Sequence, residues 1–117
     1  MLDIGCGEGL WYRVLRRLRP GIRYIGVDPS DYAVTRYGAS RHIRLGCFGT
    51  FGRMRLPGTF DLVVCADALQ YVNDRDAERG LSAICDKLRG PYGGVAYIEA
   101  YTAKDNMIGD REEWVER

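Results

Sequence analysis

The chain has 117 residues, and its 17 Lys and Arg side chains nearly balance its 16 Asp and Glu side chains, giving a formal charge of +1. This length fits one small domain, and the charge balance argues against a dedicated nucleic-acid binder, which normally carries a basic excess. No apolar run approaches the roughly 20 residues needed to span a bilayer, and no charged segment followed by an apolar one marks a secretory signal.

The cysteines indicate a reducing compartment. Cys6, Cys47, Cys65 and Cys85 are widely spaced and form no Cys-x-x-Cys pair. That spacing disfavours both a disulfide framework and a metal site. We therefore expect four reduced thiols in a cytoplasmic protein with no bound metal.

The chain opens on a strand that turns into a helix through three glycines. Residues 2–4 end a buried strand, Gly5, Gly7 and Gly9 form the turn, and residues 10–19 have helical apolar spacing. Such a turn presents bare backbone N–H groups beside the positive end of the helix dipole, where a ligand can approach closely. The dinucleotide-binding fingerprint requires Gly or Ala at position 10. Because this residue is Leu10, an NAD site is disfavoured.

The string Leu-Asp-Ile-Gly-Cys-Gly-Glu-Gly at residues 2–9 resembles the first motif of the class I S-adenosylmethionine-dependent methyltransferases. The resemblance implies a Rossmann-like α/β fold that binds S-adenosylmethionine as cofactor. It also places several residues of this motif in the cofactor site, namely Asp3, Gly5, Cys6, Gly7 and Gly9.

A second strand, predicted over residues 23–27, ends at Asp28 and the turn Pro29-Ser30. The Asp28 carboxylate, 21 residues after Gly7, lies where a ribose would cross the sheet, and its two oxygens can accept from both ribose hydroxyls. The alternative is that Asp28 caps the next helix, although Ser30 or Asp31 suits that role better. In the methyltransferases that this segment resembles, an acid here holds the ribose, and Pro29 lies beside it in the cofactor site.

The next segment departs from the family. A short helix over residues 31–39 and a weak strand over 42–45 lead to Cys47, where the family commonly has an acid that binds the exocyclic amine of adenine. Cys47 cannot make that contact, so we expect adenine to be held by backbone N–H groups of Cys47 or Phe48 and by stacking. Residues 50–59 are too short and broken for a full helix.

Residues 60–72 begin as the nearly continuous apolar run of a central parallel strand and resemble the fourth motif of small-molecule methyltransferases. The resemblance implies that Cys65 and Ala66 border the methionine part of the cofactor, and that Asp67 and Tyr71 face the substrate. Tyr71 could equally be a packing residue, and Asp67 could be a capping or solvated acid. No catalytic residue is assigned.

The last elements are a helix and a strand. The helix begins near Asn73 and Asp76, and the strand covers residues 95–101, followed by a polar tail over 102–117. One apolar face is predicted for the helix, formed by Ala77, Leu81, Ile84, Cys85 and Leu88.

Strands that alternate with helices predict a three-layer α/β/α sandwich around a parallel sheet of order 3-2-1-4-5, in one domain over residues 1–117. The family resemblance covers residues 2–101. The helix that precedes the first strand in the family and the antiparallel strands that close its sheet are not recognisable, so the domain looks partial. The apolar edge of strand 95–101 then predicts self-association.

The predicted function is methyl transfer from S-adenosylmethionine to a small-molecule acceptor by in-line displacement, which needs positioned reactants rather than a nucleophile or a metal. The sequence lacks the Asn/Asp-Pro-Pro-aromatic string of amine methylation and a Pro-Cys pair for pyrimidine methylation. The alternative is a noncatalytic adenosine-ligand-binding or scaffolding domain. An NAD-dependent oxidoreductase comes third because of Leu10.

Overall fold

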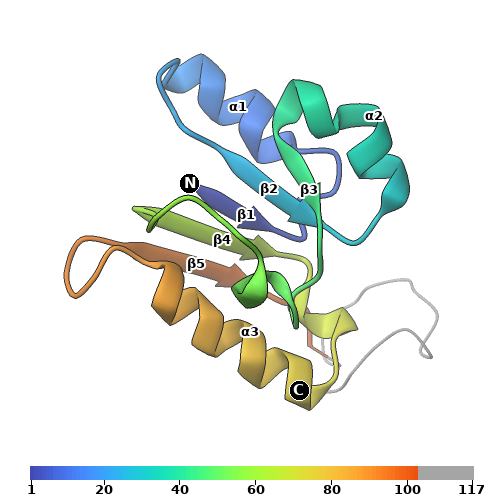
Figure 1. The fold of residues 1–117 in the computed structure, drawn as a ribbon, viewed down its shortest axis with the longest axis vertical. Helices are drawn as coiled ribbons and strands as arrows, with labels where there is room; N and C mark the ends of the chain where they lie inside the picture. The colour runs from blue at the N-terminus through green and yellow to red at the C-terminus, as the bar shows by residue number, and fades with distance from the viewer. Residues whose placement is uncertain (103–117) are drawn as a thin grey trace.

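The computed structural model describes residues 1–102 and shows one parallel five-stranded sheet with helices on its faces (Figure 1). The sheet order is β3-β2-β1-β4-β5, which confirms the predicted topology. The strands are β1 (Leu2–Ile4), β2 (Ile25–Asp28), β3 (Ile43–Leu45), β4 (Leu62–Ala66) and β5 (Val95–Glu99). The helices are α1 (Leu10–Leu18), α2 (Asp31–Arg41) and α3 (Asp74–Lys87), with 3-10 turns η1 (Phe51–Arg53) and η2 (Leu69–Tyr71).

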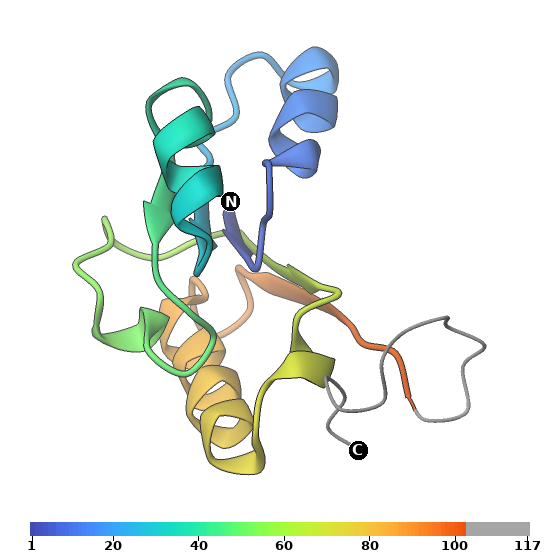
Figure 2. The same ribbon diagram turned by 90° about the vertical axis from the view of Figure 1, so that its right-hand side faces the viewer.

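The molecule has three layers. Helices α1 and α2 lie on one side of the sheet, and α3 and η1 lie on the other (Figure 2). All strand pairs are parallel, so each connection has to cross from one end of the sheet to the other. Between β3 and β4 this crossing is made by the short turn η1 rather than by a full helix, as predicted from the broken segment 50–59.

The larger core lies between the sheet and the α3 layer. Alternate residues of β1 and β4 point into it, where they meet Phe51 of η1 and Ile84 of α3. A smaller core on the opposite face joins Met1, Tyr24 and Val64 to two side chains of α1. The sheet is therefore buried on both faces at its centre, as the apolar runs of β1 and β4 require.

Helix α3 buries a different face from the predicted one. Its buried residues are Ala77, Gly80 and Ile84, whereas Leu81 and Cys85 are exposed, so the prediction for those two was wrong. The reason is Gly80, because a Cβ built there would lie 2.0 Å from the Phe48 ring. Phe48 occupies the space above this glycine, and the helix turns its small residues toward the sheet.

Helix α1 was predicted from the helical apolar spacing of residues 10–19, but none of its residues is buried. Leu10 is 65% exposed and Leu18 is 76% exposed, and Val14 is also exposed. The contacts of this helix to the smaller core come from Tyr12 and Leu15. Among residues 1–102, nothing covers the rest of this apolar stripe.

The remaining boundaries differ from prediction by one or two residues, as is usual at element ends. Helix α2 runs two residues beyond the expected position 39, and β2 begins at Ile25 instead of position 23. Strand β5 ends at Glu99 rather than at position 101, and all five of its residues are exposed. The predicted polar tail lies outside the described residues from position 103 onward.

Candidate functional site

A hollow of about 370 Å³ lies at the carboxyl ends of the strands. It opens beside β1 and β4, which are neighbours in the sheet although the connections that follow them lead toward opposite edges of the sheet. Ligands of open α/β sheets bind at such a switch point. Its lining comes from the loops after β1, β2, β3 and β4 and from the start of α3. The lining residues are Gly5, Asp28, Pro29, Cys47, Phe48, Gly49, Asp67, Ala68, Tyr71, Val72, Asn73 and Asp76.

The turn from β1 into α1 depends on its glycines. Gly5, Gly7 and Gly9 have φ values of 72°, 52° and 77°, a left-handed backbone that other residues adopt at a cost. A Cβ on Gly5 would also lie 2.6 Å from the Cβ of Ala68, so the loops after β1 and β4 touch here. A Cβ on Gly7 would meet nothing within 4 Å, which means that this part of the turn borders open space.

Asp28 is the most deeply buried of the three acids that line the hollow, and it is only 8% exposed. Its Oδ2 accepts a hydrogen bond from the Gly7 N–H at 2.7 Å, and its Oδ1 accepts one from the Ser30 N–H at 2.9 Å. The alternative that Asp28 caps α2 is wrong, because the Ser30 Oγ accepts from Ala33 N–H at the helix start. Each carboxylate oxygen has a second lone pair, so Asp28 can still accept from a hydroxyl in the hollow.

The loop after β3 closes the far end of the hollow. The Sγ of Cys47 lies 3.1 Å from the hydroxyl of Thr50, and the Cys47 N–H donates to the same hydroxyl at 3.3 Å. Phe48 is buried, with its ring 6.0 Å from that of Phe51. The Phe48 N–H has no hydrogen-bond acceptor within residues 1–102, so it is a backbone donor that this loop can offer.

The loop after β4 brings Asp67 and Tyr71 to the hollow, and both side chains are exposed. Asp67 has a φ of 58°, and its N–H donates to the Glu99 carbonyl at 3.1 Å. Cys65 and Ala66 do not line the hollow. Cys65 is fully buried in the larger core, where burial raises the pKa of its thiol to about 12.

Two residues predicted to bind cofactor lie beneath the glycine turn instead of in the hollow. Asp3 is buried and accepts a hydrogen bond from the Tyr24 hydroxyl at 2.7 Å, and burial raises its pKa to about 6. Cys6 is buried beside them, and burial raises the pKa of its thiol to about 12. These side chains support the turn, and the Cys6 N–H donates to the Val27 carbonyl at 3.2 Å.

The predicted site lacked five of the lining residues, Gly49, Ala68, Val72, Asn73 and Asp76, as well as the neighbouring Gln70. Gln70 is fully buried in η2, and both polar atoms of its amide have no hydrogen-bond partner among residues 1–102. Asp76 was interpreted as a helix-start residue, but its carboxylate also lines the hollow beside Gly49. An amide inside the apolar string 68–72 was the available signal for Gln70, whereas nothing in the sequence brings Asp76 to Gly49.

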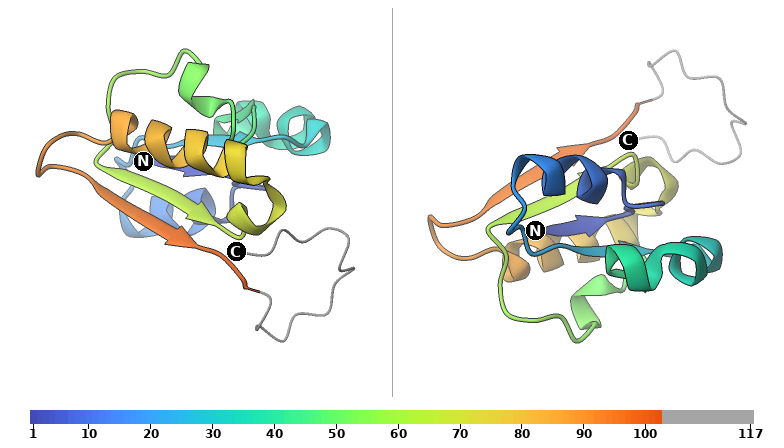
Figure 3. Two further views of the ribbon diagram at one scale, coloured as in Figure 1. Left: turned by 90° about the horizontal axis from the view of Figure 1, so that it is seen from below. Right: turned by 90° about the horizontal axis from the view of Figure 1, so that it is seen from above.

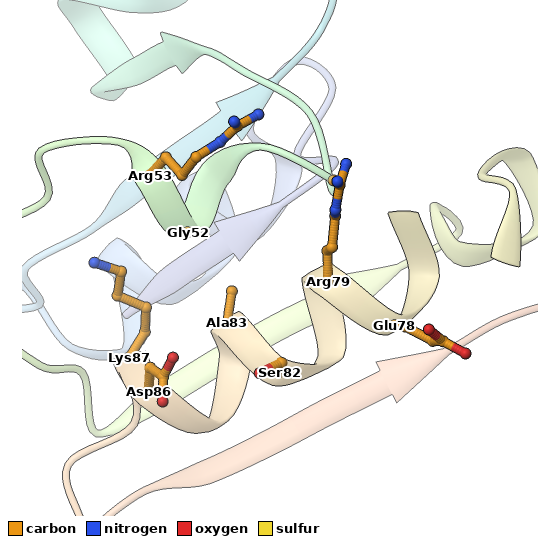
Figure 4. Close-up of a pocket in the computed structure, with 9 residues that line it drawn as sticks. Gly52, Arg53, Glu78, Arg79, Ser82, Ala83, Asp86 and Lys87 are labelled. Atoms are coloured by element: carbon orange, nitrogen blue, oxygen red, sulfur yellow. The ribbon is translucent and has the colours of Figure 1, made fainter. Parts of the chain in front are cut away.

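A second hollow, of about 620 Å³, lies between η1 and α3 and away from the carboxyl ends of the strands. Figure 4 shows Arg53, Arg79 and Lys87 reaching toward this space, while Glu78 points away from it. Its lining mixes cations with the acids Glu78 and Asp86, so it is an ordinary charged groove of the surface.

Residues 1–102 contain no group of three or more His, Cys, Asp or Glu side chains that could hold a metal ion. None of the helices described is long and apolar enough to cross a membrane.

The sequence profile described as a methyltransferase domain matches residues 2–95. The chain belongs to this methyltransferase family. It is 35% identical over 94 residues to the ubiquinone biosynthesis O-methyltransferase of Rhodopseudomonas palustris, an alignment covering 77% of this chain and 36% of that enzyme. The chain spans 25 to 36% of the length of the curated relatives that it matches.

Solved structures share the fold. The structure of DesVI from Streptomyces venezuelae superposes with a TM-score of 0.73 at 19% identity, over 92% of this chain and 44% of that one. The plantazolicin methyltransferase BpumL, solved in complex with SAH, gives 0.69 at 17% identity, over 86% of this chain and 38% of that one. The Rossmann-like methyltransferase fold predicted from the glycine motif is thereby confirmed.

Proposed function

We propose that this domain binds S-adenosylmethionine in the hollow at the carboxyl ends of the strands and serves methyl transfer to a small-molecule acceptor. The observation that carries the proposal is the Asp28 carboxylate, bonded to Gly7 N–H at the bottom of a ligand-sized hollow. Membership of the methyltransferase family and the SAH complex of the structural neighbour support the choice of ligand.

The chemistry of the hollow fits the parts of this cofactor. Asp28 supplies acceptors for the ribose hydroxyls, with Pro29 beside it, and Gly5 lines the hollow as backbone for the methionine part. The free Phe48 N–H supplies a donor for an adenine ring nitrogen. Asp3, Cys6 and Cys65 act from beneath by fixing the strands and the turn, and Gly9 closes the turn with its N–H on the Cys6 carbonyl.

When bound, S-adenosylmethionine supplies an electrophilic methyl group that an acceptor takes up by in-line displacement, so the protein has to orient the two reactants and exclude water. Tyr71 and Asp67 lie on the rim beside the loop after β1 and are the side chains available to contact the acceptor. A small molecule is the acceptor class proposed, in keeping with the O-methyltransferase relative. Four free thiols support a cytoplasmic location.

A noncatalytic adenosine-binding role is the second candidate, favoured by Cys47 at the position of the family's acid. An NAD-dependent oxidoreductase is the third, and Leu10 disfavours it.

Calorimetric titration of the 117-residue chain with S-adenosylmethionine, SAH and NAD separates the three functions, and we expect heat with the first two ligands only. Heat with NAD alone, or with none of them, overturns the proposal. A radiolabelled methyl-transfer screen over small-molecule acceptors then distinguishes transfer from binding alone.

A further inference from the structure

The hollow has a defined direction across the sheet. Gly5, Ala68 and Asp67 lie at its β1 and β4 side, Asp28 follows at the end of β2, and the Cys47–Gly49 loop lies beyond the end of β3. A nucleoside whose sugar contacts Asp28, with its other substituent toward β4, therefore has its base against the loop after β3. This end of the hollow decides which base is accepted.

Asp76 lies at that end, although it belongs to α3. A Cβ built on Gly49 would lie 2.5 Å from both Cγ and Oδ1 of Asp76, so the carboxylate is pressed against the bare α-carbon of the loop. The residue is half-buried and lines the hollow together with Cys47 and Gly49. Only glycine at position 49 leaves room for a carboxylate here.

Hydrogen bonds orient the carboxylate of Asp76 but do not use all of its acceptor capacity. Its Oδ2 accepts from the Asn73 amide at 3.2 Å, and its Oδ1 lies 3.7 Å from Arg79 in a loose, solvent-accessible ion pair. Its own N–H donates to the Asn73 Oδ1 at 2.9 Å, which fixes the first turn of α3. An ionised carboxylate offers about four lone pairs, so acceptor capacity remains.

The other acids of the hollow are placed elsewhere. Asp28 lies at the sugar position with both oxygens bonded to backbone N–H groups, and Asp67 lies at the β4 side. Cys47, on the loop itself, pairs its thiol with Thr50 and provides no carboxylate. Asp76 is therefore the carboxylate, among the residues described, that faces the base end of the hollow.

We propose that Asp76 accepts a hydrogen bond from the exocyclic amine of adenine and so makes the site selective for 6-amino over 6-keto purines. An ionised carboxylate accepts hydrogen bonds and cannot donate one, so a keto oxygen in the same place meets only repulsion. The inference rests on the proposed function, because it requires that an adenosine ligand occupies the hollow. It assigns to α3 a contact that the loop after β3 cannot make through Cys47.

The test is calorimetry with SAH and with its deaminated counterpart, S-inosylhomocysteine, on the parent chain and on Asp76→Asn. Asn keeps an oxygen for Asn73 and the backbone bond of residue 76, so the start of α3 is preserved. We expect the parent to prefer SAH by about 10- to 100-fold, the range of a charge-assisted hydrogen bond. Asp76→Asn should lose about that factor for SAH and most of the preference, because an amide can also donate to a keto oxygen.

The control is Asp74→Asn, which removes the same charge from the same helical turn at a residue that does not line the hollow. It should leave both affinities unchanged, and far-ultraviolet circular dichroism should show all three proteins folded. If the parent binds SAH but Asp76→Asn keeps its affinity and preference, the role of Asp76 is refuted while the proposed function stands. The role of Asp76 is also refuted if Asp76→Asn and Asp74→Asn weaken the binding of SAH and of S-inosylhomocysteine equally. If the parent binds neither ligand, the proposed function itself fails.

Discussion

Asp28 combines two roles in one buried carboxylate, because it accepts from the turn after β1 and also faces the hollow. Replacement by Asn puts an NH₂ group where an acceptor is needed for either Gly7 N–H or Ser30 N–H. We expect Asp28→Asn to lose about 1.5–3 kcal/mol of SAH binding and about 1–3 kcal/mol of stability. Calorimetry and urea unfolding measure the two losses. Asp31→Asn, an exposed acid in the first turn of α2, should change neither, and equal SAH binding by Asp28→Asn would place the ribose elsewhere.

A substitution at Gly7 can separate the cost of backbone strain from the effect of blocking the approach of a ligand. A Cβ at this position meets no protein atom, so Gly7→Ala costs only the left-handed backbone, about 1–2 kcal/mol. Gly58 has the same conformation, with φ of 59°, and equally open surroundings outside the hollow. Both Ala variants should lose similar stability, but only Gly7→Ala should weaken SAH binding, by tenfold or more. Unchanged binding in Gly7→Ala would show that the ligand does not approach this turn.

Asp3 should make stability depend on pH. Burial raises its folded pKa from the usual 3.8 to about 6, so the folded state holds the proton more tightly than the unfolded chain does. Stability then falls as pH rises from about 4 to about 6, by up to about 3 kcal/mol, and stays lower above that range. The difference in unfolding free energy between the parent and Asp3→Asn isolates this contribution. A difference that is flat or rises over that range would contradict the burial-driven pKa.

At the scale of elements, the strand and helix order followed from the sequence because glycine turns, capping residues and apolar runs act locally. The turn over residues 5–9, the cap at Ser30 and the broken segment after β3 all lie where they were predicted. The buried face of α3 did not follow, because it depends on Phe48 packing over Gly80, a contact between distant parts of the chain. Helical spacing alone favoured Leu81 and Cys85.

In the candidate site, too, the residues in local motifs were predicted and those placed by long-range packing were not. Gly5, Asp28, Pro29, Cys47, Phe48, Asp67 and Tyr71 were predicted from motifs and line one hollow. Asp3, Cys6 and Cys65 belong to the same motifs, but their side chains are buried, those of Asp3 and Cys65 because their strands are covered on both faces. Asp76 was not foreseen as a lining residue, because its position depends on the angle at which α3 meets the loop after β3.

The contact between α3 and the loop after β3 leads to a test of packing. A Cβ at Gly80 would lie 2.0 Å from the Phe48 ring, so Gly80→Ala forces the ring or the helix to move. We expect a loss of about 1–3 kcal/mol despite the better helix propensity of Ala. Urea unfolding measures it, with Gly90→Ala as the control, since a Cβ there meets nothing. A stabilised Gly80→Ala protein would mean that Phe48 does not rest on the helix.

For the whole molecule, one exposed apolar surface lies at the β5 edge of the sheet. Strand β5 forms an edge that pairs, among residues 1–102, only with β4 (Figure 3). The Val95 N–H donates to Asp61 and the Glu99 carbonyl accepts from Asp67, so the alternation of a parallel ladder leaves the N–H and C=O groups of Ala96 and Ile98 facing outward. On the face shared with α1, Val95 and Tyr97 are exposed, like the apolar stripe of that helix.

An exposed apolar strand edge is a template for pairing with another chain. We therefore propose that the 117-residue chain self-associates through β5 and that its light-scattering mass rises with concentration. Ile98→Lys places a charge on this edge and should keep the chain monomeric, because pairing would bury the ammonium group. Tyr92→Lys adds the same charge at a loop side chain that is 98% exposed and should leave association unchanged. A parent chain that stays monomeric at every concentration, or an Ile98→Lys chain that associates like the parent, would show that β5 is not the contact.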